Sequence, residues 1–426
     1  MSQGMTRREF MQKGLTIVAV GATAPSFLTR TALAMNNPWD VSLVASKPGV
    51  PDDRVLVVIQ LGGGNDGLNT VVPFTQDAYY RVRPTLAVPQ KDVIQLTNNI
   101  GLHPGLAKAK GLYDKGLMAI IQGVGYPNPS MSHFKSMEIW HTADPEGRVV
   151  QYGWIGRYFD SKCPGCEQPT VGVNIGPAMP LAMRAASGTG VTLETPESFQ
   201  WMPTFAGIGP REEFELFQYL NAPAPNEPGI IDFLRHTAMN AYVSSERVRD
   251  AVSKYRGGID YPNTRFGYGM KLIAQMIAGK LPTRVYFASL HGFDTHASQK
   301  GVHDRLLAEL GTVVDAFIRD LDAQGNADRV LVMAFSEFGR RVAENGSAGT
   351  DHGTAAPMFV FGKGLKGGLY GDYPSLTNLE PSGPAKGELK HTIDFRTVYA
   401  TVLDRWLGAD PKVVLGSDFE RVPFLQ

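Results

Sequence analysis

Runs of consecutive apolar residues, many of them β-branched, recur along the chain from residue 54 onward. The run 55–59, for example, contains only valine, leucine and isoleucine. Continuous apolar runs of this length are typical of strands that are buried on both faces, as in parallel sheets. The sequence therefore predicts strands at 54–61, 117–124, 170–175, 284–290, 329–335 and 357–361.

Segments with a helical spacing of apolar residues lie between several of these strands. A further helix is predicted at 392–407, where Phe395, Tyr399 and Trp406 fall on one face as a packing stripe. The alternation of strands and helices predicts an α/β fold with a mostly parallel, doubly wound sheet. The helices between the strands are predicted at 104–115, 133–142, 265–278 and 303–323.

The stretch 178–261 has a different pattern. It contains loops, the alternating Ala-Pro segment 222–225 and a long helical pattern at 230–255. We interpret it as a loop and helical insertion, or cap, on the sheet of one α/β domain that spans 54–426.

The N-terminus carries the features of an export signal. Arg7 and Arg8 form a paired-arginine motif, an apolar run follows at 14–28, and 32–34 (Ala-Leu-Ala) supplies the small residues that a signal peptidase reads. We expect 1–34 to be a twin-arginine signal peptide. The alternatives are an ordinary secretory signal or a chance pair of arginines.

Export by the twin-arginine route carries a folded protein across the inner membrane. We therefore expect a periplasmic or secreted bacterial protein whose partner during export is the twin-arginine translocase. A polar lead-in at 35–53 precedes the domain. The apolar run 14–28 is too short, and too rich in glycine, alanine and threonine, for a stable transmembrane helix. We do not expect an integral membrane protein.

The overall charge restricts the classes of partner. The chain has 41 basic and 41 acidic residues and no formal net charge. A dedicated nucleic-acid binder needs a basic excess to neutralise phosphates. We therefore expect no nucleic-acid partner.

Both cysteines lie in one short motif, Cys163-Pro-Gly-Cys166. In an oxidising compartment we expect them to form a local disulfide that closes a loop. The alternatives are a redox motif, which would need a thioredoxin-like context, or half of a zinc site, for which no second cysteine pair exists.

Residues capable of catalysis follow the first two main strands. In open α/β sheets the functional loops follow the carboxyl ends of the strands. The first strand runs into the glycine-rich segment 62–69, where Asp66 presents a carboxylate. The same residues are also typical of a simple turn. Ser132 and His133 follow the second strand. Ser132 suits either a helix N-cap or a nucleophile held near helix amides.

Two later strands are also followed by metal-capable side chains. Asp294 and His296 lie two apart after the strand 284–290, with His303 seven residues further on. Glu337 follows the strand 329–335. Arg340 follows Glu337 in the same loop and could bind a substrate anion or pair with a surface carboxylate.

Five of the nine histidines lie in or beside these loops, which a random scatter would not produce. Core packing alone would also have to account for several carboxylates, which are rarely buried unpaired. We expect the loops to share divalent cations: zinc, manganese or calcium. The candidate metal ligands are Asp66, Asp294, His296, His303, Glu337, Asp351 and His352, and the candidate catalytic residues are Ser132, His133 and Arg340.

The same segments carry a family resemblance that spans nearly the whole chain. Together they resemble domain-of-unknown-function family 1501, whose members are twin-arginine-exported bacterial proteins placed in the alkaline phosphatase superfamily. The motifs, in chain order, are 61–69 (LGGGNDGLN), 132–134 (SHF), 153–157 (GWIGR), 292–296 (GFDTH), 336–340 (SEFGR) and 350–353 (TDHG).

The resemblance implies a broad α/β sheet with metal ligands on the loops after strands and a nucleophile at a helix N-terminus. It assigns the metal-binding roles to Asp66, Asp294, His296, Glu337 and His352, and the nucleophile to Ser132.

This chain departs from the superfamily pattern at one strand end. The superfamily commonly has an adjacent Asp-His pair there, whereas this chain has Glu337-Phe338, and a phenylalanine cannot bind a metal ion. Asp351 is the candidate replacement. The Asp/His spacing around Asp294 is also tighter than in phosphatases, and His303 is the candidate for the missing imidazole.

The resulting hypothesis is an exported, metal-dependent hydrolase of a phosphate or sulfate ester, an anionic substrate. Bound cations would activate Ser132 or a water molecule, and Arg340 or Lys135 would add positive charge. The alternatives are a degenerate member that binds a ligand or partner without catalysis, or a phosphotransferase or phosphomutase that uses the same site.

Overall fold

The computed structural model describes residues 53–148, 151–162, 170–186, 190–199, 210–221 and 229–425. The expected signal peptide at 1–34, most of the lead-in and both cysteines lie outside these ranges. Within them, no helix is both long enough and apolar enough to cross a membrane.

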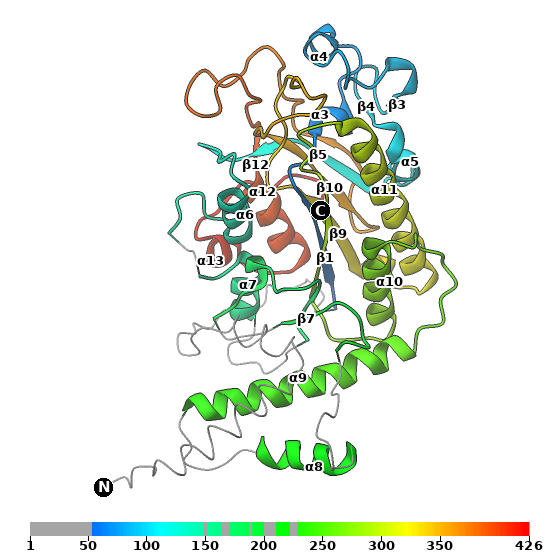
Figure 1. The fold of residues 1–426 in the computed structure, drawn as a ribbon, viewed down its shortest axis with the longest axis vertical. Helices are drawn as coiled ribbons and strands as arrows, with labels where there is room; N and C mark the ends of the chain where they lie inside the picture. Colours follow the sequence, from blue (N-terminus) through cyan, green and yellow to red (C-terminus); the bar gives the residue numbers. More distant parts are fainter. Residues whose placement is uncertain are drawn as a thin grey trace.

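A nine-stranded sheet forms the centre of the fold (Figure 1). Its strand order is β11-β5-β10-β9-β1-β8-β6-β7, with β12 paired to β5. All pairs are parallel except those of β10, which runs antiparallel to β5 and β9. The predicted mostly parallel α/β sheet is therefore confirmed. The strands are β1 (Val55–Gly62), β5 (Met118–Gly125), β6 (Gly172–Ile175), β7 (Val191–Leu193), β8 (Val285–His291), β9 (Val330–Phe335), β10 (Ala356–Phe361), β11 (Gly368–Tyr370) and β12 (Ile393–Asp394).

Alternate residues of the central strand β1 enter two separate cores, one on each face of the sheet. Val57 and Ile59 join the first core, and Val58 joins the second. The first core includes residues of α5 (Ala107–Asp114), α9 (Gly229–Ser253), α10 (Arg265–Ala278) and α11 (Gln299–Ala323). The second includes residues of α6 (His133–Thr142), α7 (Trp154–Lys162), α12 (Phe395–Thr401) and α13 (Pro411–Leu415), which lie across the sheet from α10 and α11 in Figure 1.

Short elements complete the described fold. A small antiparallel sheet has the order β2-β4-β3. Its strands are β2 (Val71–Val72), β3 (Ile94–Gln95) and β4 (Gly101–Leu102), and the remaining α-helices are α3 (Gly67–Thr70), α4 (Asp77–Val82) and α8 (Pro210–Leu220).

Two segments differ from their predicted form. The stretch 178–261 contains α8 and α9, but it also supplies β7, which pairs with β6 at the sheet edge. The predicted helix 392–407 begins as β12 and ends as the π-helix Val402–Trp406. Strands of two or three residues are too short to show a hydrophobic period, so the sequence pattern could not reveal them.

The topology brings the candidate loops to one edge of the sheet. The carboxyl ends of β8 and β9 flank that of β1, since Gly62 pairs with His291 and Gln60 with Phe335. Because β10 is antiparallel, it begins at this same edge, with Ala356 opposite Val124 near the end of β5. The segment between β9 and β10 therefore starts and finishes beside the loops that follow β1, β5 and β8.

Candidate metal centre

The glycines after β1 allow two loops to pack directly against each other. Gly63 and Gly64 have φ of +118° and +78°, a backbone conformation that side chains disfavour. A Cβ atom on Gly63 would lie 2.4 Å from the backbone nitrogen of Asp294, and one on Gly64 would lie 2.4 Å from the Phe338 ring. The glycine-rich motif thus permits close approach of the Asp294 loop.

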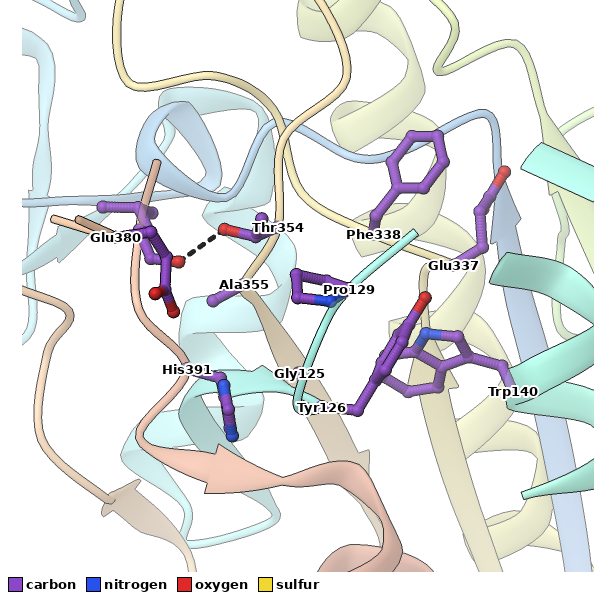
Figure 2. Close-up of a pocket in the computed structure, with 11 residues that line it drawn as sticks. Gly125, Tyr126, Pro129, Trp140, Glu337, Phe338, Thr354, Ala355, Glu380 and His391 are labelled. Atoms are coloured by element: carbon purple, nitrogen blue, oxygen red, sulfur yellow. Dashed lines mark hydrogen bonds between the residues drawn. The ribbon is translucent and has the colours of Figure 1, made fainter. Parts of the chain in front are cut away.

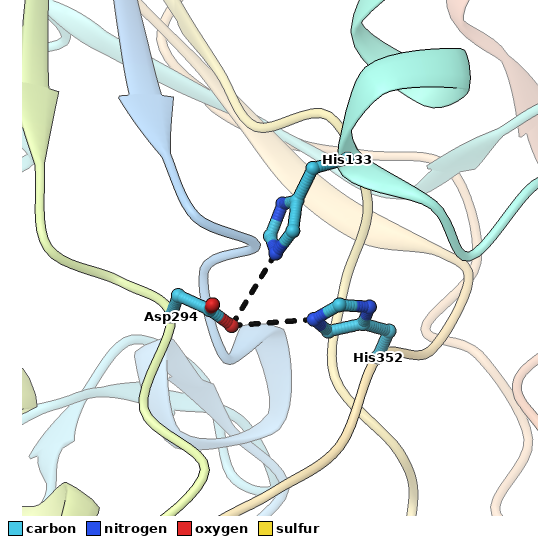
Figure 3. A group of neighbouring side chains, drawn as sticks. All are labelled: His133, Asp294 and His352. Atoms are coloured by element: carbon cyan, nitrogen blue, oxygen red, sulfur yellow. Dashed lines mark hydrogen bonds and ion pairs between the residues drawn. The ribbon is translucent and has the colours of Figure 1, made fainter.

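One oxygen of Asp294 is the meeting point of three histidines (Figure 3 shows two of them). Asp294 Oδ1 lies 3.3 Å from His133 Nε2, 3.1 Å from His296 Nε2 and 3.2 Å from His352 Nε2. The Nε2 atoms of His296 and His352 are 3.0 Å apart. We call these four side chains the His3Asp cluster. They come from the start of α6, the loop after β8 and the segment between β9 and β10.

Each histidine of the cluster is anchored through its other ring nitrogen. An acceptor at Nδ1 favours the tautomer with the proton on that atom, which leaves the Nε2 lone pair directed at the centre. This pattern is typical of histidines that bind metal ions. The Nδ1 partners are Glu337 Oε1 for His133 (2.9 Å), Asp351 Oδ1 for His296 (2.9 Å) and the Met131 carbonyl for His352 (2.7 Å).

The charges around the cluster keep its carboxylates ionised. Burial alone would raise the pKa of Asp294, but the hydrogen bond from Arg340 and the contact with His352 outweigh it and hold the pKa well below its usual range. Burial likewise opposes ionisation of Glu337, yet its bonds with His133 and the Gly63 amide lower its pKa. The bond to Glu337 in turn raises the pKa of His133. Burial lowers the pKa of His352.

The cluster is open to solvent on one side. The side chains of Asp294 and His296 are 48% and 44% exposed, whereas those of His133 and His352 are 24% and 22% exposed. Nε2 of His133 is itself buried. It lies near Asp294 Oδ1, but the angles between the two groups do not satisfy a hydrogen bond. A divalent cation would satisfy this nitrogen, so the residues present fit such an ion.

Arg340 was a candidate for binding a substrate anion or for pairing with a surface carboxylate, and in the structure it contacts Asp294 and backbone carbonyls. Its side chain is fully buried. Its guanidinium donates to the carbonyls of Gly63, Gly64, Phe293 and Thr350, and to Asp294 Oδ1 at 2.7 Å. With these partners it joins three loops and is not free to bind a ligand.

Asp66 and His303, both predicted as metal ligands, also have other partners. Asp66 is buried, lies at the N-cap of α3 and pairs with Arg83 at 2.5 Å. His303 is buried within α11 and is 3.0 Å from Asn65 Oδ1, and burial lowers its pKa to about 4. The structure does not bring either side chain into the His3Asp cluster, because buried polar groups of neighbouring elements already satisfy them.

Ser132 immediately precedes the cluster histidine of α6. It occupies the N-cap position, but its side chain makes no capping hydrogen bond and the residue is exposed. The capping role considered from the sequence is thus not realised. Lys135, one turn into the helix, pairs with Glu138 at 2.5 Å.

A small pocket lies beside the cluster (Figure 2). Glu337 and Phe338 line it, and the Phe338 ring also lies 4.8 Å and 4.7 Å from the rings of His133 and His352. Other lining residues include the aromatic side chains Tyr126 and Trp140. The pocket therefore offers mainly apolar walls next to the candidate metal centre.

Glu388 supports the segment that follows Arg340 and makes the stability of the protein depend on pH. Its carboxylate accepts the Val342 amide at 3.2 Å and lies 3.4 Å from Arg341, while burial raises its pKa to about 7. Between about pH 4.5 and 7 the folded state therefore holds this proton more tightly than the unfolded chain, so the free energy of unfolding falls as pH rises.

We expect Glu388→Gln to flatten this decline relative to the unmodified protein in urea unfolding at pH 5, 6 and 7. Parallel profiles for the two proteins would contradict this assignment.

Sequence reasoning did not single out three of the groups that build the site. The Met131 carbonyl has no sequence signal, because every residue carries one. Asn345 donates to the His296 carbonyl and to Asp351, at 2.9 and 3.2 Å. Gln299, the first residue of α11, is fully buried beneath the ligand loops.

Comparison with solved structures finds chains of similar arrangement at 9–13% identity. The C-terminal periplasmic domain of EcEptC from Escherichia coli shares 10% identity with a TM-score of 0.36, covering 89% of this chain and 93% of that one. The PsFucS1 sulfatase from Pseudoalteromonas sp. shares 12% with a TM-score of 0.34, covering 84% and 68%. A protein in the alkaline phosphatase superfamily from Vibrio parahaemolyticus shares 10% with a TM-score of 0.36, covering 96% and 79%. TM-scores this low do not carry function from those proteins to this chain.

Comparison with curated proteins found no match. A family model described as "Protein of unknown function (DUF1501)" matches residues 240–416. This segment includes three of the four residues of the His3Asp cluster and the motifs at 292–296, 336–340 and 350–353. The match over this segment agrees with the family resemblance that the motifs indicated.

Proposed function

We propose that the His3Asp cluster binds a divalent cation and that the protein uses it to hydrolyse a phosphate or sulfate ester outside the cytoplasm. The observation that carries the proposal is the convergence of three Nε2 atoms on Asp294 Oδ1, each ring being anchored at Nδ1. The Arg7-Arg8 motif supports the location, and the family resemblance supports the ester class.

The donor set favours zinc among the cations expected from the sequence. Three imidazole nitrogens and one carboxylate oxygen suit zinc, and manganese less well. Calcium prefers six to eight oxygen ligands, which this cluster does not offer. Glu337 and Asp351, expected from the sequence to bind the cation themselves, support it instead from behind His133 and His296.

The surroundings of the cluster supply the remaining parts of a hydrolase. A bound cation would neutralise charge on the ester oxygens and lower the pKa of a hydroxyl or water beside it. The Ser132 hydroxyl is exposed next to His133. In this proposal the Ser132 oxygen bonds to phosphorus or sulfur as the bond to the alcohol oxygen breaks, and the hydroxyl proton passes to the departing alcohol. Water then cleaves the serine ester, which releases the acid and restores the hydroxyl. The N-terminus of α6, which directly follows Ser132, would stabilise the negative charge of the ester.

Purified protein tests the proposal through its metal content and its turnover. We expect about one zinc ion per chain by elemental analysis, and hydrolysis of 4-nitrophenyl phosphate or sulfate that a chelator removes and zinc restores. Ser132→Ala should abolish turnover and leave the zinc content unchanged. The control Ser253→Ala, at the exposed end of α9, should retain both.

The outcomes separate the candidate roles. Absence of any bound divalent cation would contradict the whole proposal. Zinc binding without turnover of either ester would instead support the non-catalytic role considered from the sequence. Transfer of the phosphoryl group to an added alcohol, in preference to water, would identify a phosphotransferase.

A further inference from the structure

A buried glutamine joins the two loops that bring Asp294, His296 and His352 together. Gln299 is fully buried at the start of α11. Its Oε1 accepts hydrogen bonds from the hydroxyls of Thr295, at 3.1 Å, and Thr350, at 2.5 Å. Thr295 lies between Asp294 and His296, and Thr350 lies two residues before His352.

The same two threonines also contact each other through the backbone. The Thr350 amide donates to the Thr295 carbonyl at 3.2 Å. This hydrogen bond connects the loop after β8 to the segment between β9 and β10. The Gln299 side chain therefore closes a junction whose two sides carry the Nε2 atoms of His296 and His352, 3.0 Å apart.

A buried ion pair sets the orientation of the Gln299 amide. Gln299 Nε2 donates to Asp66 Oδ2 at 2.5 Å, and this oxygen also accepts from Arg83 at 2.5 Å. An ionised carboxylate only accepts hydrogen bonds, so the amide nitrogen must face Asp66 and the amide oxygen must face the threonines. Arg83 extends the connection to the Arg341 carbonyl at 2.7 Å, directly after Arg340.

We propose that Gln299, oriented by the Asp66–Arg83 pair, is a positioning residue that fixes the distance between the two ligand-bearing loops. The inference rests on the proposed function in one respect, namely that the loops hold a cation. It also gives Asp66 of the glycine-rich motif a role behind the metal centre in place of the ligand role expected from the sequence.

Gln299→Leu removes the three hydrogen bonds of this side chain while keeping its approximate volume. The first readout is hydrogen exchange at the Thr350 amide, which reports the junction with or without metal. The second is the zinc dissociation constant from a competition titration. We expect faster exchange at Thr350 and zinc binding weakened by roughly 10- to 100-fold, as for other residues that orient metal ligands.

Gln324→Leu is the matched control. Gln324 lies at the other end of the same helix and donates to Asp320 at 2.9 Å. Its replacement removes a comparable hydrogen bond, so it should lower stability while leaving Thr350 exchange and zinc affinity unchanged. Thr350→Val removes only one bond to Gln299 and should give a smaller effect of the same sign. It also serves as the test if Gln299→Leu does not fold.

The two readouts separate this inference from the proposed function. Unchanged exchange at Thr350 in Gln299→Leu, or faster exchange with unchanged zinc affinity, would overturn the positioning role. If the unmodified protein binds no zinc, the proposed function fails, but exchange at Thr350 still decides whether Gln299 holds the loops. Equal effects of Gln299→Leu and Gln324→Leu on both readouts would reduce the role to general stability and overturn the inference.

Discussion

Replacement of Asp294 by alanine is expected to weaken zinc binding by at least about 100-fold, beyond the effect of residues that only orient ligands. Its Oδ1 lies within 3.3 Å of all three cluster Nε2 atoms, so no other carboxylate of the site can take its place. Glu337 and Asp351 already face the opposite nitrogens of His133 and His296. The loss should appear in a competition titration with a chromogenic chelator.

The fold is expected to survive this change, because the Asp294 side chain is half exposed. Asp114→Ala is the control, since this exposed carboxylate pairs with Lys110 on the surface of α5, away from the cluster. It should bind zinc like the unmodified protein. An Asp294→Ala protein that retains its zinc affinity would show that the cation, if any, binds elsewhere.

Arg340→Met is expected to lower the free energy of unfolding by several kcal/mol, since each buried acceptor that loses its donor costs about 1–3 kcal/mol. The substitution removes the donors to the Gly63, Gly64 and Thr350 carbonyls and leaves those acceptors buried without them. It also removes the buried positive charge beside Asp294. Urea unfolding followed by circular dichroism measures the change.

The adjacent arginine provides a matched control. Arg341 is 46% exposed and lies 3.4 Å from Glu388, so Arg341→Met should cost no more than about 1 kcal/mol. Equal losses from the two substitutions would contradict the structural role of Arg340. Arg340→Lys keeps the charge but cannot reach all the carbonyls at once, and it should fall between Arg340→Met and the unmodified protein.

Much of the framework followed from local patterns. The apolar runs placed β1, β5, β6, β8, β9 and β10 to within one or two residues, because strands buried on both faces require continuous apolar sequence. The helices α6 and α10 begin and end where their spacing predicted. The short strands β7, β11 and β12 were not predicted, since two or three residues are too few to show a hydrophobic period.

The loops of the candidate site could also be located from the sequence, because polar residues directly after buried strands must lie at one sheet edge. His296, His352 and Asp294 were found in this way as potential ligands. The partner of each ring could not be found. Glu337 lies 204 residues from His133, and its contact depends on how the loop after β9 packs against α6.

The sequence by itself determined the α/β framework and the set of loops that gather at its edge, since these depend on burial periods and strand ends. Only the tertiary structure decided which side chains of that set converge and which have other partners. Asp66, Arg340 and His303 looked equally suited to the site, yet each is buried against groups distant in sequence. A side chain's direction is set by packing between loops, and that information does not reside in the residues of any one loop.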